Sequence, residues 1–170
     1  RNDDMKLATL KTGGRDGTPV LVSRDMTRMA LATSVASTVR DAIENWTSVE
    51  QGLQNLANKL EAEEVETIVY DPKILASPLP RAFQWADGSA YLSHMRLVRK
   101  ARGAEMPANS ETDPMLYQGG SDGFLGPVDP IPCVDKEWGL DFEGEIAVIT
   151  DDVPMGLSLI HISEPTRPSQ

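Results

Sequence analysis

Short apolar runs separated by glycine open the chain. Residues 6–11 and 19–23 are rich in apolar side chains and flank the loop at residues 13–17. Two such runs joined by a glycine-rich loop are typical of a β-hairpin. The loop lacks the Gly-Lys-Ser/Thr ending and the following helix of a phosphate-binding loop, so we interpret it as a plain turn.

Apolar positions then recur at helical spacing. Their recurrence from Val35 to Trp46 predicts a helix over residues 34–46. A second helix is predicted from Ser48, because Ser48 and Gln51 stand in the pattern of a capping box. The expected apolar face of this second helix consists of Leu53, Leu56, Ala57 and Leu60.

A proline-rich connector follows a short predicted strand at residues 68–70. Residues 77–80 read Ser-Pro-Leu-Pro, which is stiff because a residue before proline favours extended backbone. Beyond this connector glycine and proline are frequent and no helical period is sustained, which predicts a mainly β region with long loops. We therefore expect an α+β fold. A small N-terminal domain of a hairpin and helices covers residues 5–76, and the start of a mainly β domain covers residues 77–156.

The charge balance argues against some classes of partner. The chain of 170 residues has 26 acidic and 16 basic side chains, a net charge of −10. This charge disfavours nucleic acid or an anionic membrane surface as the main partner, and it also suits plain solubility. No signal peptide and no membrane-spanning apolar run is recognised. The single cysteine, Cys133, excludes an internal disulfide framework and favours the cytoplasm.

Closely spaced carboxylates are the first chemical signal. If residues 140–150 form a strand, Asp141, Glu143 and Glu145 project from one face. Like charges on one face repel each other unless a cation or solvent relieves them. Carboxylate oxygens suit Mg²⁺, Ca²⁺ or Mn²⁺. The pattern indicates a hard-metal site, with the segment from Asp87 to His94 upstream of it.

Four segments in order carry a family resemblance. They are residues 78–94, the triplet Tyr117-Gln-Gly119, residues 138–145 and residues 149–156. Together they resemble the fumarylacetoacetate hydrolase family, most closely its bacterial fumarylacetoacetase-like members. The resemblance covers residues 5–156 and implies that the second domain is the catalytic one.

The resemblance implies a metal and a base. The divalent ion, Mg²⁺ or Ca²⁺ or alternatively Mn²⁺, would be held by Asp87, Glu143 and Glu145. The catalytic histidine of the family stands seven residues after its first acidic ligand, and His94 has this spacing from Asp87.

Two further residues are assigned to substrate. Arg102 lies in an Arg-Gly-x-Glu element that resembles the family's carboxylate-binding arginine, and a guanidinium suits bidentate recognition of a carboxylate. The alternative that the basic side chains of residues 96–102 form a solvated face stays open. Tyr117 matches the family's Tyr-x-Gly position and implies a hydroxyl donated to substrate.

The implied activity is hydrolysis of a carbon–carbon bond in a 1,3-diketo acid such as fumarylacetoacetate, in tyrosine breakdown. Two alternatives remain: an oxo-acid decarboxylase or tautomerase of the same superfamily, and a non-catalytic domain that binds a divalent cation. The resemblance also implies a homodimer for the full-length protein.

The two ends of the chain differ from its middle. Met5 begins the natural-looking sequence, and residues 157–167 resemble the translation of a sequencing-library adapter. We expect residues 157–170 to be an artefact, which leaves His94 as the one native histidine. Family members continue about as long again, with a further acidic ligand and a lysine. We therefore expect the chain as written to be inactive alone.

Overall fold

A computed structural model describes residues 5–89, 91–113, 115–120, 123–140, 142–150 and 152–156. The chain divides into two compact units, Arg1–Ile131 and Pro132–Gln170, and each is described by itself. The interpretation of residues 157–170 as an artefact falls outside the described residues, as does the predicted acid Asp141. The domain bounds 5–76 and 77–156 stay a prediction.

The first unit contains an antiparallel sheet of four strands in sequence order. The strands are β1 (Lys6–Leu10), β2 (Thr18–Val22), β3 (Arg28–Leu31) and β4 (Ile68–Val69). The pairing of β1 with β2 confirms the predicted hairpin, and β4 confirms the predicted short strand. The sequence pattern did not reveal β3, because its four residues are too few to display a period.

Both faces of this sheet are covered. Side chains alternate along β2, so Val20 and Val22 point to one face and Leu21 to the other. The Val20 face packs against Leu75 from the chain after η1 (Pro72–Ile74), and the Leu21 face packs against Leu60. Each face is therefore closed by chain that follows the first three strands, with α2 on the Leu21 side.

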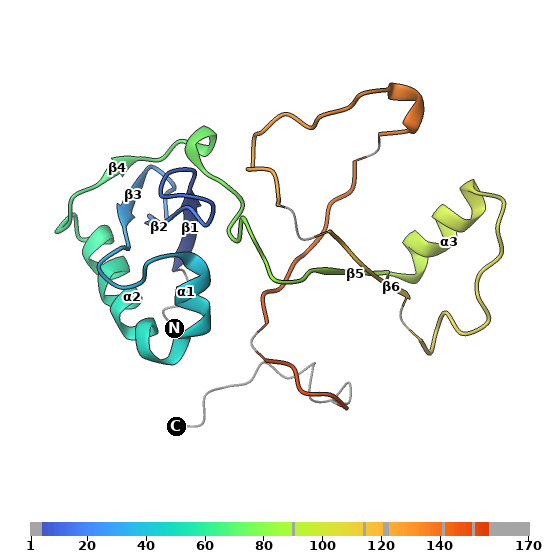
Figure 1. The fold of residues 1–170 in the computed structure, drawn as a ribbon, viewed down its shortest axis with the longest axis horizontal. Coiled ribbons are helices and arrows are strands. Elements are labelled where there is room, and N and C mark those ends of the chain that lie inside the picture. The colour runs from blue at the N-terminus through green and yellow to red at the C-terminus, as the bar shows by residue number, and fades with distance from the viewer. Residues whose placement is uncertain are drawn as a thin grey trace. The chain divides into compact units, whose positions relative to one another are not determined.

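Two helices, α1 (Val39–Glu44) and α2 (Trp46–Glu61), occupy the predicted helical region. Figure 1 shows them lying together beside the first three strands. Leu53 and Leu60 are buried, which confirms the predicted apolar face of the second helix.

Both helix starts were predicted wrongly. The first helix begins after Thr38, whose side-chain oxygen accepts a hydrogen bond from the backbone N–H of Asp41 at 2.9 Å. The second begins at Trp46, so Ser48 lies inside its first turn and donates its hydroxyl to the Asn45 carbonyl at 2.8 Å. Ser34, Ser37 and Thr38 all precede the first helix, and Thr38 is the one that caps it, whereas the N-cap residue of the second helix, Asn45, makes no side-chain cap hydrogen bond.

The later part of the first unit combines a two-stranded antiparallel sheet with a helix. The strands are β5 (Ala86–Ser89) and β6 (Met115–Gln118), and α3 (Leu92–Ala101) follows β5 directly (Figure 1). The mainly β region predicted after the connector thus also contains a helix that was not predicted. The helix is short and strongly basic, and Met95 is its one fully buried side chain among the described residues. The α+β class is confirmed.

The second unit is sparse in regular structure. Among its described residues the one element is a short 3₁₀ helix, η2 (Lys136–Trp138). The strand expected over residues 140–150 does not form within residues 142–150, which contain neither helix nor strand. In the described part of the chain, no helix has the length and apolarity needed to cross a membrane.

Candidate functional site

The β5–β6 pair brings two predicted site residues together. Asp87 on β5 is the register partner of Tyr117 on β6. Directly opposite residues of an antiparallel pair share a face, with Cβ atoms about 4.5–5.5 Å apart. A predicted metal ligand and a predicted substrate donor therefore stand side by side. Asp87 is half-buried, whereas Tyr117 is more than half exposed.

An aromatic neighbour of this pair was not recognised from the sequence. Trp85 stands just before β5 and two residues before Asp87, and its carbonyl accepts a hydrogen bond from the Gly119 N–H at 3.1 Å, so the strand pairing continues to it. The alternation of extended backbone then turns the side chains of Trp85 and Asp87 to the same face. The Trp85 ring meets the ring of Tyr117 edge-on, with centroids 5.9 Å apart. In the sequence, the one sign of this contact was that Trp85 stands two residues before Asp87. That spacing places the two side chains on one face only if the segment is known to be extended.

The helix α3 carries the predicted base and the predicted anchor. His94 is the third residue of α3 and is exposed, and Arg102 ends the helix with its backbone N–H bonded to the Val98 carbonyl at 3.1 Å. Eight residues of helix separate them by about 12 Å along the axis. The two side chains can therefore contact opposite ends of an elongated substrate rather than a single atom.

Other basic side chains of α3 make contacts within the chain. Arg96 pairs with Glu111 at 3.4 Å, and Arg99 donates a hydrogen bond to the sulfur of Met115 on β6 at 3.6 Å. The second contact ties the helix to the strand that carries Tyr117. The question whether the side chain of Arg102 binds substrate or belongs to a solvated face stays open.

The remaining predicted ligands, Glu143 and Glu145, lie in the second unit. Both are exposed, in a segment without helix or strand. Within the described part of the chain, no three His, Cys, Asp or Glu side chains gather closely enough to hold a metal ion. The chemistry of the predicted set nevertheless fits, since three carboxylates are the ligands that Mg²⁺, Ca²⁺ and Mn²⁺ prefer. The assignment of Asp87, Glu143 and Glu145 stays a prediction.

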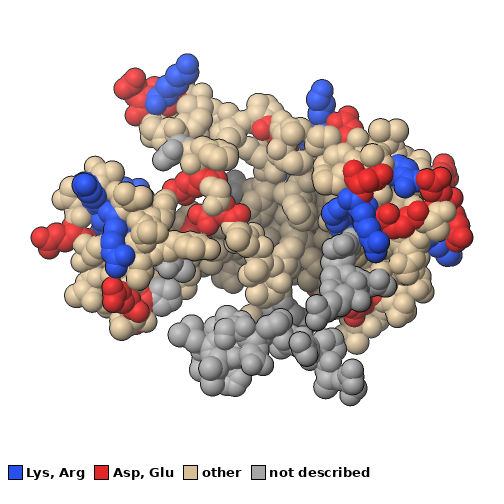
Figure 2. All heavy atoms as spheres, turned by 180° about the vertical axis from the view of Figure 1, so that it is seen from behind, with Lys and Arg blue, Asp and Glu red and all other residues tan. Residues whose placement is uncertain are grey.

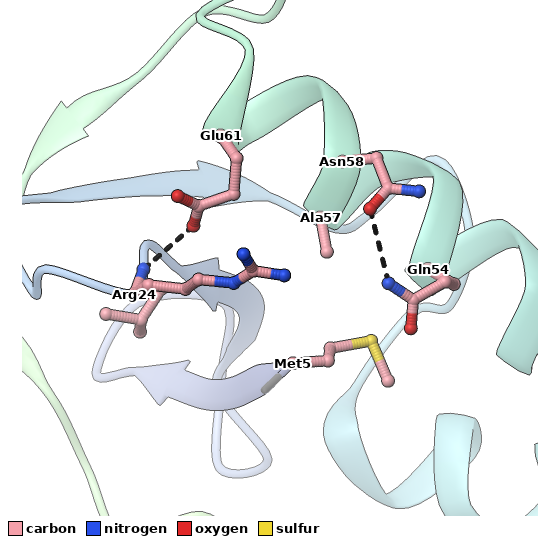
Figure 3. Close-up of a pocket in the computed structure, with 7 residues that line it drawn as sticks. Met5, Arg24, Gln54, Ala57, Asn58 and Glu61 are labelled. Atoms are coloured by element: carbon pink, nitrogen blue, oxygen red, sulfur yellow. Dashed lines mark hydrogen bonds between the residues drawn. The ribbon is translucent and has the colours of Figure 1, made fainter. Parts of the chain in front are cut away.

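Two hollows in the described part of the first unit are lined by residues other than the predicted site residues. One lies between the start of β1 and α2 and has a volume of about 10 Å³, room for about one water molecule. Figure 3 shows the residues that line it, among which Glu61 accepts a hydrogen bond from the backbone N–H of Arg24 at 2.8 Å. A larger hollow of about 290 Å³ is mainly apolar. It is lined by Ala8, Thr9, Tyr70, Leu75, Ala76, Ser77, Pro78, Leu125 and Pro127.

A partly buried ion cluster lies at the glycine-rich loop. Asp16 accepts two hydrogen bonds from Arg81, one of them from Nε at 2.9 Å, and a third from Arg40 at 3.1 Å. The hydrogen bond from Arg81 is the main reason that the pKa of Asp16 is lowered, and the charge of Arg40 adds to the effect. Arg40 also lies 5.2 Å from the centroid of the Phe83 ring, a cation–π distance.

Charges on the visible surface are mixed in sign. On the face in Figure 2, basic side chains have acidic side chains beside them. Arg28 with Glu63 at 2.6 Å and Lys11 with Asp129 at 2.5 Å are two such pairs within the first unit.

Two family models match the chain in succession. The model described as fumarylacetoacetase N-terminal domain 2 matches residues 5–81. The model described as fumarylacetoacetate (FAA) hydrolase C-terminal matches residues 84–158. A search of curated proteins gave no match. The second matched region contains all six candidate residues: Asp87, His94, Arg102, Tyr117, Glu143 and Glu145.

Proposed function

The chain belongs to the fumarylacetoacetate hydrolase family, and from this premise we propose that it cleaves a carbon–carbon bond in a 1,3-diketo acid such as fumarylacetoacetate. Domains of these two kinds support a fumarylacetoacetase-like hydrolase or a decarboxylase of the same superfamily. The observation that carries the finer proposal is the residue set of the second region. It supplies acids for a metal, a histidine for water, and an arginine and a tyrosine for an anionic substrate.

A divalent metal fits this proposal. Asp87, Glu143 and Glu145 would hold the ion through carboxylate oxygens. When bound, such an ion polarises a carbonyl group and stabilises the negative charge of an enolate.

The side chains of the chain itself would do the remaining work. The imidazole of His94 can act as a general base and accept a proton from water. The water oxygen then bonds to the substrate carbonyl carbon, and the adjoining carbon–carbon bond breaks. Its electron pair leaves with the enolate carbon, which receives the proton back from His94.

Substrate orientation would come from two residues. The guanidinium of Arg102 suits a bidentate contact to a carboxylate of the substrate. The Tyr117 hydroxyl can donate to a substrate oxygen, and the pairing of Tyr117 with Asp87 supports this role because it sets the donor beside a predicted metal ligand. Both contacts would hold the diketone next to the water that His94 activates.

Variants of the full-length gene product test the proposal. Purified enzyme is assayed with fumarylacetoacetate, other acylpyruvates and oxaloacetate at saturating Mg²⁺. We expect His94→Ala to lower kcat by about 10²–10⁴-fold, the usual contribution of a general base, with Ser93→Ala as the neighbouring control on α3. Substantial turnover by His94→Ala would remove the proposed base.

Metal binding is tested separately by calorimetry with Mg²⁺ and Mn²⁺. Glu143→Ala should weaken binding strongly, whereas Glu137→Ala, an exposed glutamate on η2, should leave it unchanged. Normal Mg²⁺ affinity in Glu143→Ala would contradict the ligand assignment. Turnover of oxaloacetate alone would assign the decarboxylase alternative, and metal binding without turnover of any oxo acid would assign a binding domain.

A further inference from the structure

We propose that Trp85 is a positioning residue that locks the register of β5 and β6 and so keeps Tyr117 on the same face as Asp87. The inference deepens the proposed function and rests on it, since it assigns Trp85 to the same site. No part of the sequence resemblance assigned a role to this tryptophan.

Trp85 is held at three points around its ring. Its indole N–H donates a hydrogen bond to the carbonyl of Gly120 at 2.6 Å. Its ring meets Tyr117 edge-on at 5.9 Å and Phe124 at 5.8 Å between centroids. Edge-to-face aromatic pairs of this kind contribute about 0.5–1.5 kcal/mol beyond the area that they bury. The side chain thus reaches across the strand pair and contacts the chain on both sides of Gly119.

Gly119 forms the slot in which the indole lies. The backbone N–H of Gly119 donates to the carbonyl of Trp85 at 3.1 Å, which extends the β5–β6 register by one pair. A Cβ atom at position 119 would overlap the six-membered ring of Trp85. Glycine is therefore required opposite Trp85 by close packing. This packing gives a physical reason for a glycine two residues after Tyr117.

The register of this pair needs such a lock. A two-stranded sheet alone is marginally stable in water, and each strand here has four residues. A slip by one residue would turn Tyr117 to the opposite face from Asp87. A slip of one residue in one direction would set the indole opposite Gln118, which carries a Cβ atom. A slip in the other direction would set it opposite Gly120, whose carbonyl accepts the indole hydrogen bond in the observed register. Trp85 therefore selects the arrangement in which donor and acid are neighbours.

The first test needs no substrate. Amide hydrogen exchange of the full-length protein is compared for wild type, Trp85→Phe and Gly119→Ala. The control variant is Trp46→Phe, because Trp46 is the first residue of α2 and lies outside the β5–β6 pair. We expect the Gly119 and Tyr117 amides to exchange about tenfold faster in Trp85→Phe and Gly119→Ala, because local opening of the strand pair becomes easier. The control should leave both rates unchanged. Circular dichroism establishes that each variant is folded.

The second test is a double-mutant cycle on turnover. Trp85→Phe should lower kcat/KM for the diketo acid about tenfold in the wild-type background, since a small displacement of a binding group has a large effect on rate. In a Tyr117→Phe background the same change should have less than about a twofold effect, because the residue through which it acts has lost its hydroxyl. A merely structural role would give equal losses in both backgrounds.

The two tests separate the inference from the proposed function. Unchanged exchange in Trp85→Phe together with additive kinetic losses would overturn the inference and leave the hydrolase proposal standing. If the amides exchange faster in Trp85→Phe but the wild-type protein turns over none of the oxo acids, the role of Trp85 in fixing the register is supported and the proposed function is contradicted. If Gly119→Ala does not fold, Trp85→Phe still decides between these outcomes.

Discussion

At the scale of single residues, the two turns that flank β2 depend on particular backbone and side-chain chemistry. Gly17, just before β2, has φ of +68°, and an added Cβ would overlap Thr9 and the Leu10 carbonyl. Gly14 in the same loop has φ of +87° and no atom within 4 Å of such a Cβ. The two glycines share a left-handed backbone and differ in the space around them.

This difference predicts unequal effects of alanine. Gly14→Ala should lower the free energy of unfolding by about 1 kcal/mol, the cost of a left-handed L-residue. Gly17→Ala should lower it by about 2–4 kcal/mol, because steric overlap with β1 adds to that cost. Urea denaturation of both variants measures the difference. Equal losses would mean that the backbone angle alone matters at Gly17.

Asp25 shapes the turn after β2. It accepts hydrogen bonds from the Ser23 hydroxyl at 2.6 Å and from the Thr27 hydroxyl at 2.8 Å. These bonds, with that of the Thr27 backbone N–H, lower the pKa of Asp25 to about 2. A carboxylate with a depressed pKa stabilises the fold fully above its unfolded pKa of about 4, and this contribution is lost as the pH falls toward 2.

We therefore expect Asp25→Ala to lower the urea midpoint at pH 7 and to lose this disadvantage between pH 4 and pH 2. Unfolding curves at several pH values, for wild type and variant side by side, measure the gap. A gap that stays constant down to pH 2 would show that the charge of Asp25 is irrelevant to the turn.

At the scale of elements, α3 is the helix that the sequence pattern did not reveal. Its apolar positions stand among two arginines and a lysine, and the helix has only ten residues, so the sequence displays no sustained period. Met95 is 4% exposed, while Leu97, two residues later, is 68% exposed. Packing through one face thus distinguishes two apolar side chains that look equivalent in the sequence.

Alanine at these two positions tests the packing of α3. Met95→Ala should lower the free energy of unfolding by about 2 kcal/mol, typical of a cavity left by a large buried side chain. Leu97→Ala should change it by less than about 0.5 kcal/mol, as expected at an exposed site. Thermal and urea unfolding measure both values. Similar losses for the two would mean that α3 packs through another face than the one described.

At the scale of the first unit, the Asp16 cluster joins parts of the chain that are far apart in sequence. It links the loop before β2 with Arg40 of α1 and with Arg81 after the proline-rich connector. The pKa of Asp16 is lowered, so the cluster stabilises the fold above pH 4 and loses its effect as the pH falls below that value. The ion pairs of Asp16 therefore hold the end of the connector next to the loop before β2, and their contribution to stability depends on pH.

Asp16→Asn should lower the urea midpoint at pH 7, and the deficit should shrink below pH 4, where the wild-type carboxylate is protonated. The deficit should also be smaller at 1 M NaCl, where the Debye length is about 3 Å. Glu50→Gln, which removes an exposed charge on α2, is the matched control and should have little effect. A deficit independent of both pH and salt would contradict an ionic role.

Much of the local structure was predictable from sequence because local structure leaves a period or a turn signal in it. The β1–β2 hairpin, the apolar face of α2 and the strand at β4 are of this kind. The ordered motifs of the second half likewise pointed to the family and to its candidate residues. These signals depend on neighbours within a few residues, where spacing alone carries the information.

Tertiary structure decided what depends on distant partners. Met29 pairs with Ile68, Trp85 with Gly119 and Asp16 with Arg81, and no local pattern specifies which distant residue closes each contact. Such pairings depend on complementary shape and charge across long loops, and the entropy of closing a loop changes only slowly with its length. The candidate acids and the candidate histidine were predicted from their spacing in the sequence, and they stay predictions. The tryptophan and glycine that align one of those acids with Tyr117 required the fold.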